Sequence, residues 1–206
     1  HIVTRGFCAD TVTSPLTIHQ KPVLSSAITN VSCSGGNNGA IDLSVSGSPL
    51  FTYNCTNGAT TQDINGLAIG SYTVTVTDAN SCSSSLTATI IQPPVLVITN
   101  VNTNVSCNGG NDGGINLTVV GGTPAYSFDW GGGVTTQNRT NLSGGTYTVT
   151  ITDAKACTSI APISVYQPNA VNIVTAVTNV SFNSQNNGAI NLTVTGGTGA
   201  YNYNWS

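Results

Sequence analysis

Six cysteines are the residues of this chain best suited to covalent chemistry. Four of them form two equivalent pairs, Cys33 with Cys82 and Cys107 with Cys157, each about 50 residues apart. None has the short spacing typical of metal-binding cysteines, so the pattern predicts disulfides and an oxidising compartment. Cys8 stands outside the two pairs and is a candidate for bonding to a cysteine beyond these 206 residues.

The groups used in acid–base catalysis are scarce. The chain has no Glu, and its two histidines, His1 and His19, fall in an atypical first segment, so no repeated acid–base pair is available. Lys21 and Lys155 occupy non-equivalent positions, which argues against an isopeptide staple repeated in each copy. We therefore expect a protein that is not an enzyme and that needs no cofactor.

Calcium is the metal that the oxygen-rich loops could hold. The candidate ligands are Asp112 in a Gly/Asn-rich loop, and Asp78 and Asp153 in two hairpin turns. Ca²⁺ sites normally gather several carboxylates, whereas each of these loops has one Asp. Asn38 and Asn187 take the place of Asp112 in the other copies. We expect these side chains to provide turn geometry and expect no bound metal.

Composition narrows the possible partners. Charged residues make up 5% of the chain, 39% is apolar, and the mean hydropathy is +0.11, which indicates a folded protein. A net charge of −3 with four scattered cations gives no basic surface for nucleic acid. No apolar run approaches the ~18 residues needed to cross a bilayer, so we expect no membrane span here.

The sequence repeats about every 75 residues, which indicates an array of similar units. Two complete repeats are predicted at 23–94 and 95–168. Residues 1–22 resemble the C-terminal part of a preceding repeat, and residues 169–206 the N-terminal half of a following one. We expect these residues to be a window from a longer tandem protein. The alternative is that the tail of one chain is completed by the head of the next through strand complementation.

Each copy contains short segments with the alternation of β-strands. Ile41, Leu43 and Val45 alternate with polar residues, and Gly, Pro and Asn separate this segment from the next. About seven such strands per copy predict an all-β fold of tandem immunoglobulin-like β-sandwich repeats. Short Pro-containing linkers would stack these repeats as a rod. A β-solenoid is the main rival, but its repeat is normally much shorter.

An alternating aromatic stripe, Tyr126, Phe128 and Trp130, could stack on sugars or face the core. Alternate residues share one face of a strand, and burial explains the stripe without a ligand, so we expect a core face. Cys55 replaces the Trp in the preceding copy, and we expect it to be a buried, free thiol. The other residues expected in the core are Tyr72, Val74, Val76, Tyr147, Val149 and Ile151.

Residues 105–119 read Val-Ser-Cys-Asn-Gly-Gly-Asn-Asp-Gly-Gly-Ile-Asn-Leu-Thr-Val, and 121–126 and 72–80 add Gly-Gly-Thr-Pro-Ala-Tyr and Tyr-Thr-Val-Thr-Val-Thr-Asp-Ala-Asn. These strings resemble the SprB repeat, named after a very large surface adhesin of gliding Bacteroidetes. The resemblance implies an extracellular protein exported by the type IX route. The chain departs from the pattern at Cys55, and at Phe182, where a cysteine is expected.

Two schemes are open for the recurring cysteines. Pairing within a copy is the default, because the pair recurs once per copy and closing such a loop contributes about 4 kcal/mol in the chain-entropy model. However, the first turn and the last hairpin lie at opposite ends of an immunoglobulin-like sandwich, and bridged Cα atoms lie within about 7 Å. The alternative is therefore a bridge from Cys33 to Cys157, between neighbouring repeats.

Two functions follow from this reading. The favoured one is a structural segment of a large, secreted cell-surface adhesin or filament, whose partners are neighbouring repeats and possible surface glycans or abiotic surfaces. The resemblance to the SprB repeat also implies a role in gliding motility. The alternative is a discrete carbohydrate-binding module. Asp10-Thr11-Val12 also resembles an O-glycosylation signal of Bacteroidetes, which makes Thr11 a candidate site of modification.

Overall fold

The fold is all-β throughout the part of the chain that the structure describes. In this computed structural model those residues are 2–5, 8–11, 17–183 and 185–206, with side chains described from residue 17 onward. They contain no helix long and apolar enough to cross a membrane. The chain divides into two compact units, His1–Gln92 and Pro93–Ser206, which are described one at a time.

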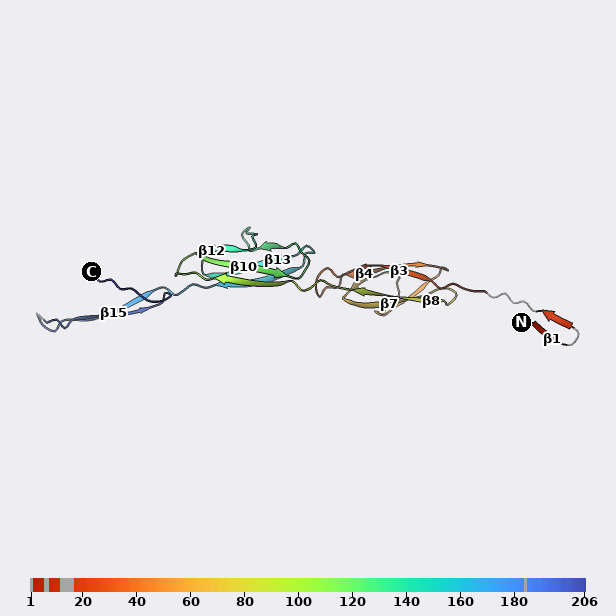
Figure 1. Cartoon of the computed structure of the whole chain (residues 1–206), viewed down its shortest axis with the longest axis horizontal. Coiled ribbons are helices and arrows are strands. Elements are labelled where there is room, and N and C mark those ends of the chain that lie inside the picture. The colour runs from red at the N-terminus through yellow and green to blue at the C-terminus, as the bar shows by residue number, and fades with distance from the viewer. Residues whose placement is uncertain (1, 6–7, 12–16, 184) are drawn as a thin grey trace. The chain divides into compact units, whose positions relative to one another are not determined.

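The first unit holds a two-sheet sandwich after a short hairpin (Figure 1). One antiparallel sheet has the order β3-β4-β6 and the other the order β5-β7-β8. These are the A-B-E and C-F-G arrangements of an immunoglobulin-like domain, so that prediction is confirmed. The strands are β1 (Ile2–Arg5), β2 (Cys8–Thr11), β3 (Val23–Thr29), β4 (Gly39–Ser46), β5 (Thr52–Cys55), β6 (Ile64–Leu67), β7 (Gly70–Thr77) and β8 (Ser83–Ile90).

The second unit repeats this topology and adds one further hairpin. Its sheets have the orders β12-β10-β9 and β11-β13-β14, and β15 pairs with β16 alone. Figure 1 shows β10, β12 and β13 within this second sandwich. The strands are β9 (Val97–Thr103), β10 (Gly113–Val120), β11 (Ser127–Asp129), β12 (Arg139–Leu142), β13 (Gly145–Thr152), β14 (Thr158–Val165), β15 (Asn172–Thr178) and β16 (Ala189–Thr195).

Each sandwich has its own apolar core, built from alternate residues of both sheets. In the first, Ile41 and Leu43 of β4 meet Val74 and Val76 of β7, and all four side chains are essentially inaccessible to water. The intervening residues of β7 are threonines that face outward. A period of two places one set of side chains on each face, so the Thr/Val alternation by itself fixes which face is buried.

Each sandwich has six strands, whereas the sequence predicted about seven. The segment that would form strand D satisfies the edge of β4 with side chains and makes no backbone ladder. Asp63 Oδ1 accepts a hydrogen bond from the Leu43 N–H at 3.0 Å, and Gln62 Nε2 donates to the Leu43 carbonyl at 2.5 Å. Strand D of an immunoglobulin-like domain pairs with strand E, so these two bonds continue the β4–β6 pairing beyond Ile64, and residues 56–63 form no strand. In the second unit the same bonds join Leu117 to Asn138 and Gln137.

The hairpin β15–β16 is the first half of a sandwich without its second sheet. Ile190 is 53% exposed, whereas Ile115 at the equivalent position of β10 is 1% exposed. Val180 and Val105 show the same contrast. The apolar face of the A-B pair is therefore encoded in the strand sequence, but its burial depends on the C-F-G sheet.

Truncating a core side chain should destabilise the first sandwich strongly. Leu43→Ala is expected to lower its free energy of unfolding by about 2–5 kcal/mol, because it removes a fully buried side chain and leaves a cavity. Val23→Ala, on exposed β3, is the matched control and should change it by less than about 0.5 kcal/mol. Urea unfolding monitored by far-UV circular dichroism gives the free energy of unfolding of both variants, and calorimetry provides a second measurement. Equal effects would contradict the assigned core.

Candidate functional site

The hairpin turn that begins at Asp153 is held together by that carboxylate. Asp153 Oδ1 accepts hydrogen bonds from the backbone N–H groups of Lys155 and Cys157, at 2.8 and 2.9 Å. Oδ2 accepts from the Thr123 N–H at 2.7 Å, and the Ala154 N–H donates to the Thr123 carbonyl at 3.0 Å. The bond from Thr123, followed by those from Cys157 and Lys155, holds the pKa of Asp153 below its ordinary value.

Asp78 makes the same turn in the first unit but with one bond fewer. Its Oδ1 accepts from the N–H groups of Asn80 and Cys82, both at 2.9 Å. Its Oδ2 is buried and has no hydrogen-bond partner among the described residues. The reason lies in the loop before β5, where Gly47-Ser-Pro-Leu50 is one residue shorter than the second copy's Gly121–Ala125. In this shorter loop Asp78 Oδ2 meets no donor equivalent to the Thr123 N–H.

Asp112 bonds a serine within the first loop of its repeat, and Asn38 and Asn187 bond the equivalent serines in their own loops. Asp112 accepts hydrogen bonds from the Ser106 N–H at 3.0 Å and from the Ser106 hydroxyl at 2.5 Å. These two bonds, the hydroxyl first, lower the pKa of Asp112. The Asn side chains make the corresponding pair of bonds to Ser32 and Ser181.

None of the three Asp residues considered for calcium lies in a ligand cluster. Within the described ranges, no group of three or more His, Cys, Asp or Glu side chains comes together. The oxygens of Asp112 and Asp153 are directed at backbone and hydroxyl donors instead. The geometry therefore supports the structural reading of these turns, in which one carboxylate organises a short loop.

The aromatic stripe packs against the core of the second sandwich. Tyr126, Phe128 and Trp130 are half-buried and contact the central cluster. The Trp130 indole donates to the Thr136 carbonyl at 2.8 Å. The centroids of the Trp130 and Tyr147 rings also lie 5.5 and 5.4 Å from the Arg139 guanidinium, which gives two cation–π contacts.

Arg139 is the residue of this site that sequence reasoning missed. The first copy has Ile64 at the same position, buried with Cys55 in one cluster. The second copy therefore has a Trp–Arg pair where the first has a Cys–Ile pair. Comparing the two copies at both positions together could have revealed the exchange. Cys55 itself is 3% exposed and is a free thiol, and burial raises its pKa.

Of the remaining expected core residues, Val74, Val76, Val149 and Ile151 are fully buried. The two tyrosines at the start of the F strands are only partly buried, at the edge of each core. Tyr72 donates to the Ala68 carbonyl at 3.0 Å, and Tyr147 to the Ser143 carbonyl at 2.9 Å. The side chains of Cys8 and Thr11 lie outside the described residues.

The two bridges expected within a copy are not formed. Cys82 and Cys107 are free thiols, whereas Cys33 and Cys157 are disulfide-bonded. Cys82 immediately precedes the eight-residue strand β8. The loop of Cys33 lies at the other end of that strand, because the Val31 N–H donates to the Ile91 carbonyl at 3.0 Å. Eight strand residues span about 26 Å, far beyond the ~7 Å limit for bridged Cα atoms.

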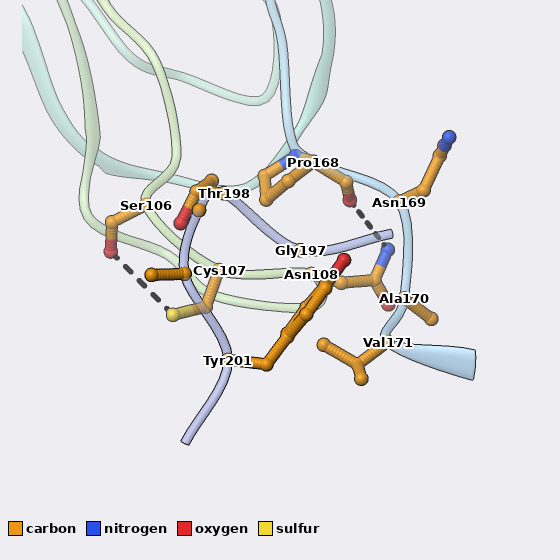
Figure 2. Close-up of a pocket in the computed structure, with 12 residues that line it drawn as sticks. Ser106, Cys107, Asn108, Pro168, Asn169, Ala170, Val171, Gly197, Thr198 and Tyr201 are labelled. Carbon is orange, nitrogen blue, oxygen red and sulfur yellow. Dashed lines mark hydrogen bonds between the residues drawn. The ribbon is translucent and has the colours of Figure 1, made fainter. Parts of the chain in front are cut away.

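A pocket of about 440 Å³ lies in the second unit beside Cys107, a free thiol in the loop before β10 (Figure 2). One wall is the loop Ser106–Asn108, in which the Ser106 hydroxyl contacts the Cys107 sulfur at 4.0 Å. Asn108 Nδ2 donates to the Pro168 carbonyl at 3.0 Å and anchors this loop to the end of its repeat. Residues 197–201, from the turn after β16, also line the pocket.

Replacing each turn carboxylate with the amide of asparagine should change the stability of the two sandwiches by different amounts. Asp153→Asn should lower the melting temperature of its sandwich at neutral pH, because an NH₂ group would face the Thr123 N–H. Asp78→Asn is the matched control, with the smaller effect expected, because its Oδ2 faces no donor. Differential scanning calorimetry of both variants measures the two shifts.

The same comparison has a pH dependence of defined sign. A carboxyl whose folded pKa is lowered adds stability above its unfolded pKa of about 3.9, and loses it as pH falls through the folded value. The gap between the wild type and Asp153→Asn should therefore be full at pH 7 and close at acid pH. A gap independent of pH would contradict the role assigned to the ionised carboxylate.

Comparison with solved structures finds only distant likeness. The N-terminal eight immunoglobulin domains of the Down Syndrome Cell Adhesion Molecule match 71% of this chain at 12% identity, with a TM-score of 0.38. Domains 4–9 of the surface layer protein SbsC match 85% at 14% identity, with a TM-score of 0.31. This chain spans 25% and 36% of those two chains. A search of curated proteins gave no match.

A family model matches the chain three times, once in each repeat. The SprB repeat model covers residues 25–60, 99–135 and 174–206, together more than half of the sequence. Each match begins on the A strand (β3, β9 or β15) and extends through the first loop and the B strand. It therefore includes Asp112 and its Asn equivalents, whose bonds to a loop serine recur in all three copies. The chain belongs to the SprB repeat family.

Proposed function

We propose that this chain is a structural repeat segment of a large, secreted cell-surface adhesin or filament. The observation that carries the proposal is the threefold match to the SprB repeat, which together covers more than half of the chain. The disulfide bonding of Cys33 and Cys157 supports an extracellular location, because disulfides persist in oxidising compartments. Gliding motility and export by the type IX route belong to the proposal through the family resemblance.

The exposed face of each C-F-G sheet supports a solvated spacer. Side-chain hydroxyls pair across β7 and β8, Thr73 with Thr87 at 2.8 Å and Thr75 with Ser85 at 2.9 Å. In the second sandwich Thr146 pairs with Ser164 at 3.2 Å. Such uncharged ladders stay hydrated, and as cross-strand pairs they stabilise the sheet. Weak contacts through such faces would be multiplied in a long array by effective concentration.

A non-catalytic role is part of the proposal. The carboxylates that sequence reasoning singled out are engaged with backbone or hydroxyl donors within their own loops. Across the described part of the chain they do not gather with histidine or cysteine in groups of three. The observed bonds give these side chains a fold-organising role, which leaves no identified acid–base pair for chemistry.

We assign the chain to repeats at 23–94 and 95–168, with part of a preceding repeat at 1–22 and half of a following one at 169–206. The linkers after Gln92 and Gln167 are short and contain proline, which favours a serial, rod-like array. Small-angle X-ray scattering of the 206-residue chain should give the elongated profile of domains in series. A compact, near-spherical particle would contradict this arrangement.

Surface location and ligand binding can be tested separately. Antibodies against the chain should label intact cells of the producing organism, and protease treatment of those cells should remove the label. Labelling only after permeabilisation would overturn the proposal. On a glycan array the spacer should show no saturable micromolar binding. Saturable binding to one sugar class would favour a carbohydrate-binding module. The variants Trp205→Ala and Trp130→Ala would then compare the contribution of an exposed indole to that binding with the contribution of a packed one.

A further inference from the structure

The second sandwich has a shallow pocket on its C-F-G sheet, separate from the one beside Cys107. This pocket has a volume of about 300 Å³ and lies where the start of β13 meets the end of β14. Such a volume is at the lower end of the range for ligand sites, so it suits a small molecule or one residue of a polymer. The residues that line it are Gly144, Gly145, Thr146, Ser164, Val165, Tyr166 and Gln167. These lining residues are all uncharged, which favours a neutral ligand.

Tyr166 gives this pocket an exposed aromatic ring. Its side chain is 68% exposed, whereas Val165 before it is buried in the core. Alternation along the strand therefore directs Tyr166 to the outer face of the sheet, where Ser164 also lies. Both backbone polar groups of Tyr166 are bonded, because its N–H donates to Asn104 Oδ1 at 3.1 Å and its carbonyl accepts from the Val105 N–H at 2.9 Å. The ring is thus attached to a fixed backbone.

Two glycines form the floor of the pocket. A Cβ atom at Gly144 would lie 2.7 Å from Gln167 Cγ and 2.9 Å from Gln167 Cβ, so a larger residue would displace the Gln167 side chain. A Cβ atom at Gly145 would meet nothing within 4 Å, so that stretch of backbone is open. Glycine is the residue that lets a ligand approach the backbone closely. The floor beside the Tyr166 ring is therefore accessible to a flat ligand.

Hydrogen-bonding groups lie beside the ring and the floor. Thr146 Oγ1 and Ser164 Oγ are 3.2 Å apart, and each hydroxyl has the capacity to bond a further partner. Gln167 Oε1 accepts a hydrogen bond from the Gly109 N–H at 3.1 Å, which fixes the side chain and leaves the donors of Nε2 for a ligand. The pocket thus combines donors and acceptors with an exposed aromatic ring.

A neutral sugar ring has the chemistry that matches this lining. The C–H face of a pyranose is apolar and stacks on an aromatic ring, while the hydroxyls at its rim both donate and accept hydrogen bonds. Ligand sites typically pair such an aromatic surface with a few placed polar groups. An acidic sugar or a phosphate would need a cation, and the residues that line this pocket include none.

The first repeat has different residues at the two positions that define the site. Ile69 takes the place of Gly144, and Ile91 takes the place of Tyr166. Both isoleucines are more than half exposed, at 54% and 56%. The hydroxyl pair and the Gln are retained, as Ser71, Thr89 and Gln92. The first repeat is therefore a control within the same chain, in which only the aromatic ring and the glycine floor are exchanged.

We propose that this pocket binds one neutral pyranose residue of a surface glycan, stacked on Tyr166 and hydrogen-bonded by Thr146, Ser164 and Gln167. The inference rests on the proposed adhesin role and gives that role a point of contact in the second repeat. A shallow site that holds a single ring binds with a dissociation constant on the order of 1 mM. Such contacts support adhesion when many are engaged together, whereas one copy gives no micromolar binding.

A sugar titration of the 206-residue chain, followed by amide NMR, tests the site. The probes are D-glucose, D-galactose, D-mannose and N-acetyl-D-glucosamine. At least one probe should shift the amide signals of Gly144 and Tyr166 saturably in the millimolar range, while the signals of Ile69 and Ile91 stay unchanged. The proposal is wrong if no probe gives a saturable shift, or if the two repeats respond equally.

Substitutions at the ring identify its part in binding. Tyr166→Ile, which copies the first repeat, should abolish the saturable shifts, because it removes the stacking surface. Tyr166→Phe is the matched control and should retain them, because the ring remains. Tyr166 is exposed, so the calorimetric transition of the second sandwich should stay the same in both variants. A sugar response that survives Tyr166→Ile, or is lost in Tyr166→Phe, would overturn the proposal.

Filling the floor gives a second, independent variant. Gly144→Ile also copies the first repeat and should abolish the sugar response, because its side chain occupies the space beside Tyr166. An unchanged response would contradict the assigned site. The labelling of intact cells tests the adhesin role separately. A negative titration with labelled cells therefore removes this site alone, whereas unlabelled cells overturn the proposed function whatever the titration gives.

Discussion

The apolar face of one β-sheet must be covered by a second sheet, and the rest of this structure depends on that requirement. The sequence provides its own comparison, since Ile115 and Ile190 are equivalent residues with opposite exposure. The first is covered by β13 and β14, whereas the second belongs to a sheet without that partner. Strand pairing alone forms β15–β16, but burial, the dominant favourable term in folding, comes only when two sheets pack.

Once the two sheets are packed, a few polar side chains organise the ends of each sandwich. Asp153 ties the last hairpin to the turn before strand C, and Gln167 ties the first loop to the outgoing chain. These bonds lie at opposite ends of the domain. These polar side chains are thus placed at the domain ends, whereas hydroxyls pair across the outer faces of β7–β8 and β13–β14 between them.

Small sequence differences between the copies have local structural consequences. In the second copy the Thr123 N–H donates to Asp153 Oδ2. The loop before β5 is one residue shorter and provides no such donor, so Asp78 Oδ2 is unpaired among the described residues. The exchange of Cys55 and Ile64 for Trp130 and Arg139 replaces a buried apolar pair with a half-exposed cation–π stack. Both changes leave the central positions apolar, since Val74 and Val76 of β7 correspond to Val149 and Ile151 of β13, and all four are fully buried.

The sequence by itself determined the all-β class, the repeat and the buried strand faces, because an alternation of period two depends only on neighbouring residues. It also identified Cys55 as the substitute for Trp130. The tertiary structure decided the contacts between residues that lie far apart in the sequence. It has no strand between β5 and β6, where the side chains of Gln62 and Asp63 bond the backbone of β4. It also placed Cys33 and Cys82 at opposite ends of β8, because the separation of two residues in space depends on strand order, which spacing along the chain does not fix.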